Sequence, residues 1–265
     1  MTSELTEAFS LRGRAAVVTG AAGGIGRQAA ITFAQAGADV VIADVGADGL
    51  EETASLVGGL GVRVVQRRVD VSQREQVEAL ADAAESDLGR IDVWANVAGI
   101  IRYSPIVDMS EADLRAVLDV NLFGLYWGVA AAGRRMSAGG SIVNVASAGG
   151  DMPAPTLSGY GMSKAAVMHL TKTAAVEFGP RGVRVNAVAP GFVDTPMVAR
   201  YYTDESGRED PDAKQRILAT RAGQSPLGVT GVTTDITYAM LYLAVSASRF
   251  VTGQVLRPNG GVFMA

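Results

Sequence analysis

The composition excludes several classes of chemistry. The chain has 265 residues, a net charge of −4, no cysteine and one histidine, His169. Without cysteine there can be no disulfide, thiol nucleophile or zinc-thiolate site, and one imidazole cannot make a multi-histidine metal site. We therefore expect no metal, and we expect proton chemistry to use Tyr, Lys, Asp or Glu.

The charge pattern and the N-terminal segment bear on partners and location. Acidic and basic residues are interspersed, which argues against nucleic acid and anionic membranes as partners. We interpret Arg134 and Arg135 as the solvated end of a helix. The first 14 residues lack an apolar run of signal-peptide length, and the longest apolar stretch, 122–132, is too short to cross a bilayer. These features predict a cytoplasmic protein without a membrane partner.

Short β-branched runs alternate with helical patterns along the whole chain, which is typical of βαβ units in a parallel sheet. This predicts a single doubly wound α/β (Rossmann) domain over 1–265, with a seven-stranded parallel sheet flanked by helices on both faces. The predicted strands are Ala15–Thr19, Asp39–Asp44, Val62–Val69, Ile91–Asn96, Ser141–Ala146, Val183–Ala189 and Gly253–Arg257. The predicted helices are Gly26–Ala36, Gly49–Val57, Ser72–Leu88, Glu111–Met136, Ser158–Phe178 and Thr234–Ala244.

Local signals refine this pattern. Ser72 with Glu75 predicts a capping box, and Ser110 with Asp113 resembles one. Residues 199–228 are polar and contain Pro211 and Pro226. So long a connection in a compact domain is typical of a functional loop, and we predict a substrate lid around 196–228 with a short helix in it.

A glycine-rich loop lies between the first predicted strand and the first predicted helix. Gly20, Gly24 and Gly26 would let the backbone approach a pyrophosphate at the start of that helix. Asp44 follows 24 residues after Gly20, close to the position of an acid that binds the adenosine ribose. Its charge would repel a 2′-phosphate, and neither Gly23 nor Val45 is basic, so NAD is favoured over NADP.

The spacing Thr19-Gly20-x-x-x-Gly24-x-Gly26 resembles the cofactor loop of the classical short-chain dehydrogenase/reductases. The resemblance extends through Asn259-Gly260-Gly261, with Asn96-Val97-Ala98-Gly99 departing from the family's Asn-Asn-Ala-Gly at Val97. It implies an adenine contact by Asp70 and Val71, and a nicotinamide carboxamide site at Pro190-Gly191 with Val193 and Thr195. The implied dinucleotide-binding set is Gly20, Gly24, Ile25, Gly26, Asp44, Asp70, Val71, Asn96, Ala98, Gly99, Tyr160, Lys164, Pro190, Gly191, Val193 and Thr195.

Tyr160 and Lys164 stand four residues apart, on one face of a predicted helix, and Ser147 precedes Tyr160 by 13 residues. A cation about 4 Å from the phenol, at an effective dielectric near 20, contributes roughly 4 kcal/mol, or about three pKa units. We therefore expect Lys164 to lower the tyrosine pKa and Tyr160 to act as general acid and base. Ser147 would hydrogen-bond the substrate oxygen. The resemblance adds Asn121 as holder of a water and gives Lys164 the nicotinamide ribose.

Other residues have less specific interpretations. The expected substrate wall is mostly apolar, which predicts a small, fairly hydrophobic alcohol or ketone. Arg102 could meet an anionic group, but we expect it to be an exposed loop residue. His169 is interpreted as structural. Apolar helices around 114–136 and 165–178 predict a homodimer or homotetramer. The wall candidates are Ile101, Arg102, Tyr103, Gly149, Gly150, Asp151, Met152, Phe192, Met197, Tyr201 and Tyr202.

Three functions remain open at this point. The leading hypothesis is an NAD-dependent secondary-alcohol dehydrogenase or carbonyl reductase. A 3-oxoacyl-thioester reductase is the second, against which Asp44 weighs because such enzymes of the family usually use NADPH. The third is a dinucleotide-sensing binding protein without turnover, against which the presence of Ser147, Tyr160 and Lys164 weighs.

Overall fold

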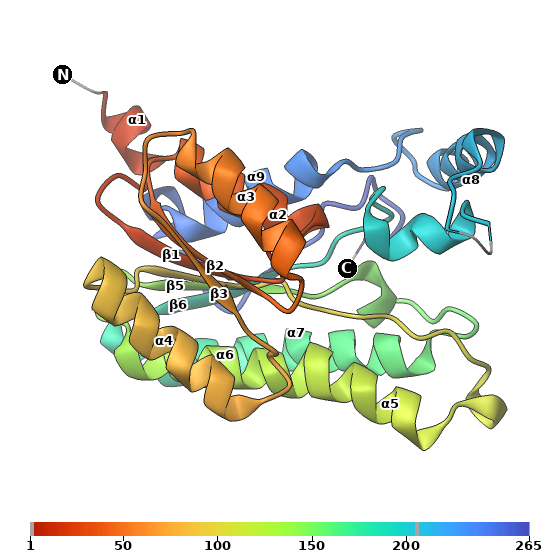
Figure 1. Cartoon of the computed structure of the whole chain (residues 1–265), viewed down its shortest axis with the longest axis horizontal. Coiled ribbons are helices and arrows are strands. Elements are labelled where there is room, and N and C mark those ends of the chain that lie inside the picture. The colour runs from red at the N-terminus through yellow and green to blue at the C-terminus, as the bar shows by residue number, and fades with distance from the viewer. Residues whose placement is uncertain (1–2, 205–206, 265) are drawn as a thin grey trace.

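A seven-stranded parallel sheet forms the centre of the protein in the computed structural model, which describes residues 3–204 and 207–264. Its order is β3-β2-β1-β4-β5-β6-β7, so the chain reverses direction across the sheet between β1 and β4. The predicted fold class is confirmed (Figure 1). The strands are β1 (Ala15–Thr19), β2 (Asp39–Asp44), β3 (Val64–Arg68), β4 (Val93–Asn96), β5 (Ser141–Val145), β6 (Arg184–Val188) and β7 (Val255–Leu256).

The outermost strand is shorter than predicted. Only Val255 and Leu256 of β7 pair with β6, at Ala187 and Val188. Gly253 has φ +71°, which breaks the extended backbone before the strand, and Pro258 follows without an N–H to continue a ladder. β3 and β4 each begin two residues later than expected, because only the residues from Val64 and Val93 onward join the ladder.

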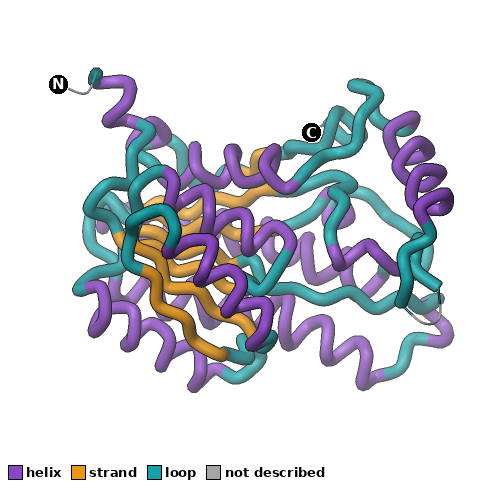
Figure 2. The backbone as a smooth tube through the Cα atoms, turned by 45° about the horizontal axis from the view of Figure 1, so that its top comes forward, coloured by secondary structure: helices purple, strands orange, loops and turns teal. Residues whose placement is uncertain are grey.

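Helices cover both faces of the sheet, as Figures 1 and 2 show. On one face Val77, Val129 and Val167 belong to a buried apolar cluster with Trp94 of β4. On the other face Phe33 and Met240 pack in a second cluster with Ile42 of β2. The first face carries α4 (Arg74–Leu88), α6 (Leu125–Arg135) and α7 (Ser158–Phe178), and the second carries α2 (Gly24–Gln35), α3 (Ala47–Gly58) and α9 (Thr233–Ala244).

The long helix predicted over 111–136 is interrupted. It consists of α5 (Glu111–Leu118), a π-helical turn η2 (Asp119–Gly124) and α6. The Asn121 side chain inside this turn bonds to the backbone of Ile100, and such a wider turn is common where a helix serves a functional site. The stretch Glu111–Arg135 is long and apolar enough to cross a membrane by length and composition, with half of its most apolar window buried inside the protein.

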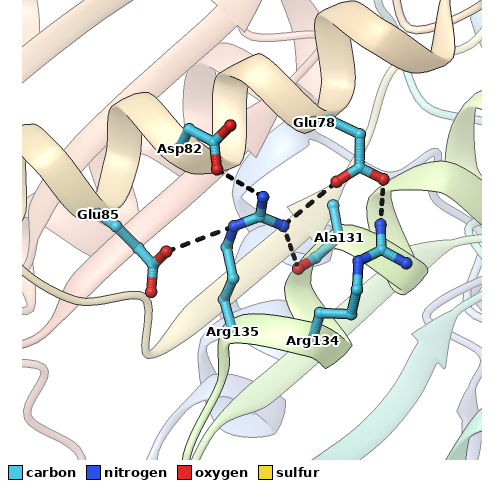
Figure 3. A network of polar contacts seen from close by, with 6 residues as sticks. All are labelled: Glu78, Asp82, Glu85, Ala131, Arg134 and Arg135. Carbon is cyan, nitrogen blue, oxygen red and sulfur yellow. Dashed lines mark hydrogen bonds and ion pairs between the residues drawn. The ribbon is translucent and has the colours of Figure 1, made fainter.

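Arg134 and Arg135 end α6 as their sequence suggested, and Arg134 is exposed, but Arg135 is partly buried and both are paired with acidic side chains. They bind the acidic face of α4 from the last turn of α6 (Figure 3). Arg135 Nη2 lies 2.6 Å from Asp82 and its Nε 3.4 Å from Glu85, while both arginines pair with Glu78. These ion pairs hold α4 and α6 side by side on one face of the sheet.

Two helix starts were predicted from capping signals, and one is wrong. Ser110 accepts a hydrogen bond from the Asp113 N–H and begins α5 as expected. Ser72 instead donates from both its N–H and its hydroxyl to Asp70, so α4 begins only at Arg74. A carboxylate is a stronger hydrogen-bond acceptor than a neutral group, so Ser72 bonds to Asp70 and does not cap α4.

Shorter elements complete the chain. The segment after β6 contains η5 (Pro196–Tyr201) and α8 (Pro211–Gly223), which is capped by Asp210 and starts with proline. The N-terminal α1 (Glu4–Ala8) has no counterpart among the predictions. Single 3₁₀ turns are η1 (Ile106–Asp108), η3 (Ala148–Gly150), η4 (Gly179–Arg181) and η6 (Ser246–Ser248).

Beneath the sheet, a chain of buried polar side chains joins two strands to α7. Trp94 Nε1 donates to Asn96 Oδ1 at 2.8 Å, and Asn96 Nδ2 donates to Asn144 Oδ1 at 2.9 Å. Asn144 in turn donates to Thr171 at 3.0 Å. Gly128 of α6 lies directly on this chain, where a Cβ would stand 2.1 Å from Asn96 Oδ1.

Gly128→Ala should lower the free energy of unfolding by about 1–3 kcal/mol, because the added methyl displaces the Asn96 side-chain amide, which is held by hydrogen bonds to Trp94 and Asn144. Denaturant unfolding measures the effect. Gly179→Ala is the matched control, since its backbone is helical and its Cβ would meet open space. Equal stability of the two variants would contradict the packing described for α6.

Candidate functional site

A cleft of about 1200 Å³ opens at the carboxyl ends of the strands. It lies over the point where the strand order reverses between β1 and β4, which is where open α/β sheets bind ligands. Most of the predicted site residues line it. They are Gly20, Gly24, Ile25, Gly26, Asp44, Asp70, Val71, Ala98, Gly99, Ser147, Tyr160, Lys164, Pro190, Gly191, Val193 and Thr195.

Two predicted residues do not line this cleft. The Asn96 amide belongs to the buried polar chain beneath the sheet, with Trp94 and Asn144 as its partners. Asn121 is fully buried and donates to Ile100 O and to Ser163 Oγ, while its Oδ1 accepts from Ile100 N. Asn121 thus holds the loop after β4 in place from behind, whereas the Asn96 side chain joins β4 to β5.

The glycine-rich loop is shaped by close backbone contacts. Gly20 has φ +71°, and a Cβ there would come 2.6 Å from Ala98 N. At Gly26 a Cβ would come 1.9 Å from Gly20 O, so any side chain would push α2 away from the loop. Thr19 joins the loops after β1 and β4, since its hydroxyl accepts from Val97 N at 3.1 Å.

This loop fits a dinucleotide pyrophosphate. The α2 N-cap, Gly23, has no side chain to satisfy the first helical N–H groups, and nothing lies within 4 Å of where its Cβ would be. Free N–H groups and the positive end of the helix dipole therefore face open space in the cleft. The residues present suit a nicotinamide dinucleotide, whose pyrophosphate this helix end would hold.

Two carboxylates stand at this end of the cleft. Asp44 accepts from Ala22 N and Gly46 N, both at 3.0 Å, which fixes its orientation beside the glycine loop. Asp70 accepts from Ser72, and its N–H donates to Gln76 Oε1. Gly23 and Val45 line the cleft near Asp44, and neither carries a positive charge. Arg68 is opposite Asp44 in the β2–β3 register but does not line the cleft.

Ser147, Tyr160 and Lys164 meet at the floor of the cleft. Ser147 follows β5, and its hydroxyl accepts from Gly149 N at 3.1 Å. Tyr160 is in the first turn of α7 and hydrogen-bonds Ser147. Lys164, one turn later, is 97% buried; its Nζ donates to Val145 O at 2.8 Å and lies 5.7 Å from the centroid of the Tyr160 ring.

The ionisation of this pair differs from the expectation. Burial raises the pKa of Tyr160, and the hydrogen bond with Ser147 offsets this only in part. Burial lowers the pKa of Lys164 to about 8. The expected lowering of the tyrosine pKa does not occur in the free protein, because burial outweighs the hydrogen bond with Ser147. The Lys164 ammonium itself is hydrogen-bonded to the Val145 carbonyl. The phenol is therefore protonated at neutral pH, which suits a proton donor.

Asn121 stands next to Lys164 without touching the cleft. A Cβ at Gly99 would lie 3.3 Å from Asn121 Oδ1 and 3.6 Å from Lys164 Nζ, so the two side chains meet behind this glycine. Asn121 fixes the Gly99–Ile100 backbone and is a positioning residue. Its role in holding a water stays a prediction.

The outer part of the cleft is aromatic, apolar and basic. Of the predicted wall residues, Ile101, Arg102, Tyr103, Gly149, Met152, Phe192, Met197 and Tyr201 line it. The prediction that Tyr202 lines the cleft is wrong, because this side chain is buried and its hydroxyl donates to Asp194. Gly150 and Asp151 are also turned away, the first against Lys164 and the second in an ion pair with Arg257. Arg102 is exposed and pairs with Asp113 at 3.3 Å.

Several residues of the cleft were missed in the sequence. Arg200, Arg221 and Gln224 come from the segment after β6, and Leu157 and Val262 complete the wall. The segment has no strong periodicity, so no sequence pattern fixes which of its side chains face the cleft. The only signal was Arg200 directly before the predicted wall residues Tyr201 and Tyr202.

Comparisons with known proteins agree with this geometry. The family model described as enoyl-(acyl carrier protein) reductase matches residues 20–263. A cis-4-hydroxycyclohexanecarboxylate dehydrogenase of Sinomonas cyclohexanicum is 39% identical over 258 residues, covering 96% of this chain and 98% of the relative. A 3-oxoacyl-(acyl-carrier-protein) reductase of Thermotoga maritima is 37% identical, covering 95% and 98%. The crystal structure of a short-chain type dehydrogenase/reductase from Mycobacterium marinum superposes with a TM-score of 0.89 at 33% identity, covering 99% and 100%.

Proposed function

Because the chain belongs to the short-chain dehydrogenase/reductase family, we propose that it interconverts a small, fairly hydrophobic secondary alcohol and its ketone with NAD(H), using Tyr160 as general acid and base. It is an oxidoreductase of CH–OH groups that uses a nicotinamide cofactor. The observation that carries the proposal is the meeting of Ser147, Tyr160 and Lys164 at the floor of one cleft.

In the reductive direction, Tyr160 transfers its phenolic proton to the substrate carbonyl oxygen. A reduced nicotinamide held in the cleft would supply the hydride to the carbonyl carbon, and with the proton from Tyr160 the C=O group would become CH–OH. Because burial keeps the pKa of Tyr160 above its ordinary value, the proton is present on the phenol at neutral pH. In the oxidative direction Tyr160 takes the same proton back.

Ser147 and Lys164 support this transfer in different ways. Ser147, fixed by the Gly149 N–H, hydrogen-bonds the substrate oxygen and stabilises the charge that develops on it. Lys164 Nζ lies 5.7 Å from the centroid of the Tyr160 ring, from where it would stabilise the phenolate once the proton has left and could bind the nicotinamide ribose. Asn121 orients the loop at Gly99 and holds the water that connects Lys164 to solvent.

NAD is the proposed cofactor. The fixed Asp44 carboxylate lies where the adenosine ribose would bind, and a negative charge there repels a 2′-phosphate. Asp70 and Val71 would border the adenine, while Pro190, Gly191, Val193 and Thr195 would hold the nicotinamide end. The chain would work as one dinucleotide-binding and catalytic domain, with residues 196–228 as its substrate lid.

A 3-oxoacyl-thioester reductase is the second candidate, favoured by the 37% identity to the Thermotoga maritima enzyme. A preference for NADPH and a requirement for a thioester substrate would distinguish this candidate from the first. A binding protein without turnover is disfavoured because Asn121, Ser147, Tyr160 and Lys164 are all present and close together.

The protein is proposed to be a cytoplasmic homodimer or homotetramer. Phe123 and Tyr126 on the η2–α6 helix, and Met162 and Val176 on α7, are large apolar side chains that remain exposed in the single chain. A second copy that covered them would remove this apolar surface from water. A light-scattering mass equal to one 27.4 kDa chain would contradict this assembly.

Tyr160→Phe should lower kcat for reduction of a secondary ketone by about 10²–10⁴-fold, because the ring stays in place while its proton is lost. NAD binding should stay within about twofold, as measured by titration calorimetry. Tyr238→Phe is the control, since this side chain is exposed on α9 outside the cleft. Near wild-type turnover by Tyr160→Phe with intact NAD binding would refute the mechanism.

Asp44→Asn should raise the ratio of kcat/KM for NADPH to that for NADH by at least about tenfold, because a repulsion of about 1.4 kcal/mol or more is removed while the shape is kept. Steady-state kinetics with both dinucleotides measures the ratio. Asp48→Asn removes a nearby exposed carboxylate that does not line the cleft, and it should leave the ratio unchanged. A wild-type enzyme that prefers NADPH would overturn the cofactor assignment.

A further inference from the structure

Two arginines project into the outer part of the cleft from the segment after β6. Arg200 lies over the Tyr103 ring, with its Cζ 3.8 Å from the ring centroid. Arg221 lies over Phe192 at 5.2 Å and near Tyr201 at 5.8 Å. The rings themselves are in contact, since Tyr103 and Tyr201 meet edge to face with centroids 5.8 Å apart. Both guanidinium groups thus rest on one aromatic surface.

Neither arginine has an acidic partner among residues 3–204 and 207–264. Arg221 donates one hydrogen bond, to Gln224 Oε1 at 3.2 Å, and Arg200 donates none within that part of the chain. The Asp194 carboxylate, on the same segment after β6, is bound by Lys214 and by the Tyr202 hydroxyl. Within residues 3–204 and 207–264, no carboxylate therefore pairs with either of these two positive charges.

This arrangement favours an anion. A guanidinium group that lies over an aromatic ring keeps the N–H donors in its own plane available. Two of these donors match the two oxygens of a carboxylate. Stacking also fixes the side chain, so less conformational entropy is lost when a ligand binds. A neutral substrate would leave both charges without a partner.

The two arginines and the proton donor Tyr160 line one cleft. Tyr103, whose ring Arg200 covers, lines the same cleft. Met152, Leu157 and Met197 supply apolar wall to the same cleft. A compact substrate can therefore place its carbonyl at Tyr160 and its anionic group at the arginines.

We infer that the substrate is a compact hydroxy or oxo acid whose carboxylate, on the side of the molecule away from the reacting carbon, is bound by Arg200 and Arg221. The inference rests on the proposed function, because it names the substrate class of that same site. It also corrects the expected wall in one respect: the wall is apolar for the body of the substrate and cationic at its outer end.

The test is a binding measurement with a matched pair of ketones. Calorimetry compares 4-oxocyclohexanecarboxylate with 4-oxocyclohexanecarboxamide on the full-length protein saturated with NAD⁺, where no hydride is available and the ketones cannot react. The acid should bind at least about tenfold more tightly than the amide, since a charge-assisted pair contributes about 1.5–3 kcal/mol.

Variants assign that preference to the two arginines. Arg200→Met and Arg221→Met should each weaken binding of the acid about tenfold and leave the amide within about twofold. Arg221→Lys should restore only part of the affinity, because an ammonium lacks the planar fork. Arg216→Met is the control, as this exposed arginine of α8 does not line the cleft.

Equal affinity for acid and amide, or no measurable binding of the acid, would overturn the inference. Arginine variants that weaken binding of the acid and the amide equally would also overturn it. So would variants that weaken binding of acetoacetyl-CoA but not of the acid, because the arginines would then bind the phosphates of the thioester. Turnover of the two ketones with NADH tests the proposed function separately. Reduction of the amide without preference for the acid removes the inference alone, whereas preferential binding of the acid without any reduction removes the proposed function alone.

Discussion

The hydrogen bond from Lys164 Nζ to the Val145 carbonyl, 2.8 Å long, connects α7 to the carboxyl end of β5. The bond joins the last residue of β5 to the second turn of α7, and Ser147 and Tyr160 therefore meet above it. Burying an ammonium disfavours its charged form, which is why the pKa of Lys164 falls to about 8. Catalytic sites commonly hold groups with a shifted pKa, and the rest of the fold has to stabilise the buried Lys164 side chain.

The cleft holds charges of both signs at different walls. Asp44 and Asp70 stand beside the glycine loop, where the N-terminus of α2 also lies. Arg200 and Arg221 stand over the aromatic wall residues Tyr103, Phe192 and Tyr201, and Tyr160 and Lys164 line the same cleft. A dinucleotide without a 2′-phosphate suits the acidic wall, and a carboxylate suits the basic one.

Sequence reasoning succeeded where a motif is tied to a regular element. The glycine loop, Asp44 and the Tyr160–Lys164 pair are anchored to strands and helices whose periodicity is clear, and the structure brings them together. It failed where side-chain direction depends on tertiary contacts. Spacing cannot show that Asn96 turns beneath the sheet toward Trp94.

The segment after β6 shows the same limit more strongly. Its residues follow no sustained helical or strand period, so the sequence could not place Arg200 over Tyr103 or bury Tyr202 against Asp194. The pKa of Tyr160 could not be predicted from the sequence either. The expected effect of Lys164 on Tyr160 assumed that the ammonium points at the phenol, whereas in the free protein the Val145 carbonyl takes it.

That Tyr160 donates the proton, and becomes a base only when the oxidised cofactor adds its positive charge, is tested most directly by an ultraviolet titration of tyrosinate. The signal of Tyr160 is the difference between wild type and Tyr160→Phe, recorded against pH with and without saturating NAD⁺. Without NAD⁺ the pKa of Tyr160 should lie above its ordinary value. With NAD⁺ it should fall by about two to three units, as a cation close to the phenol requires. The same pKa in both titrations would contradict this mechanism.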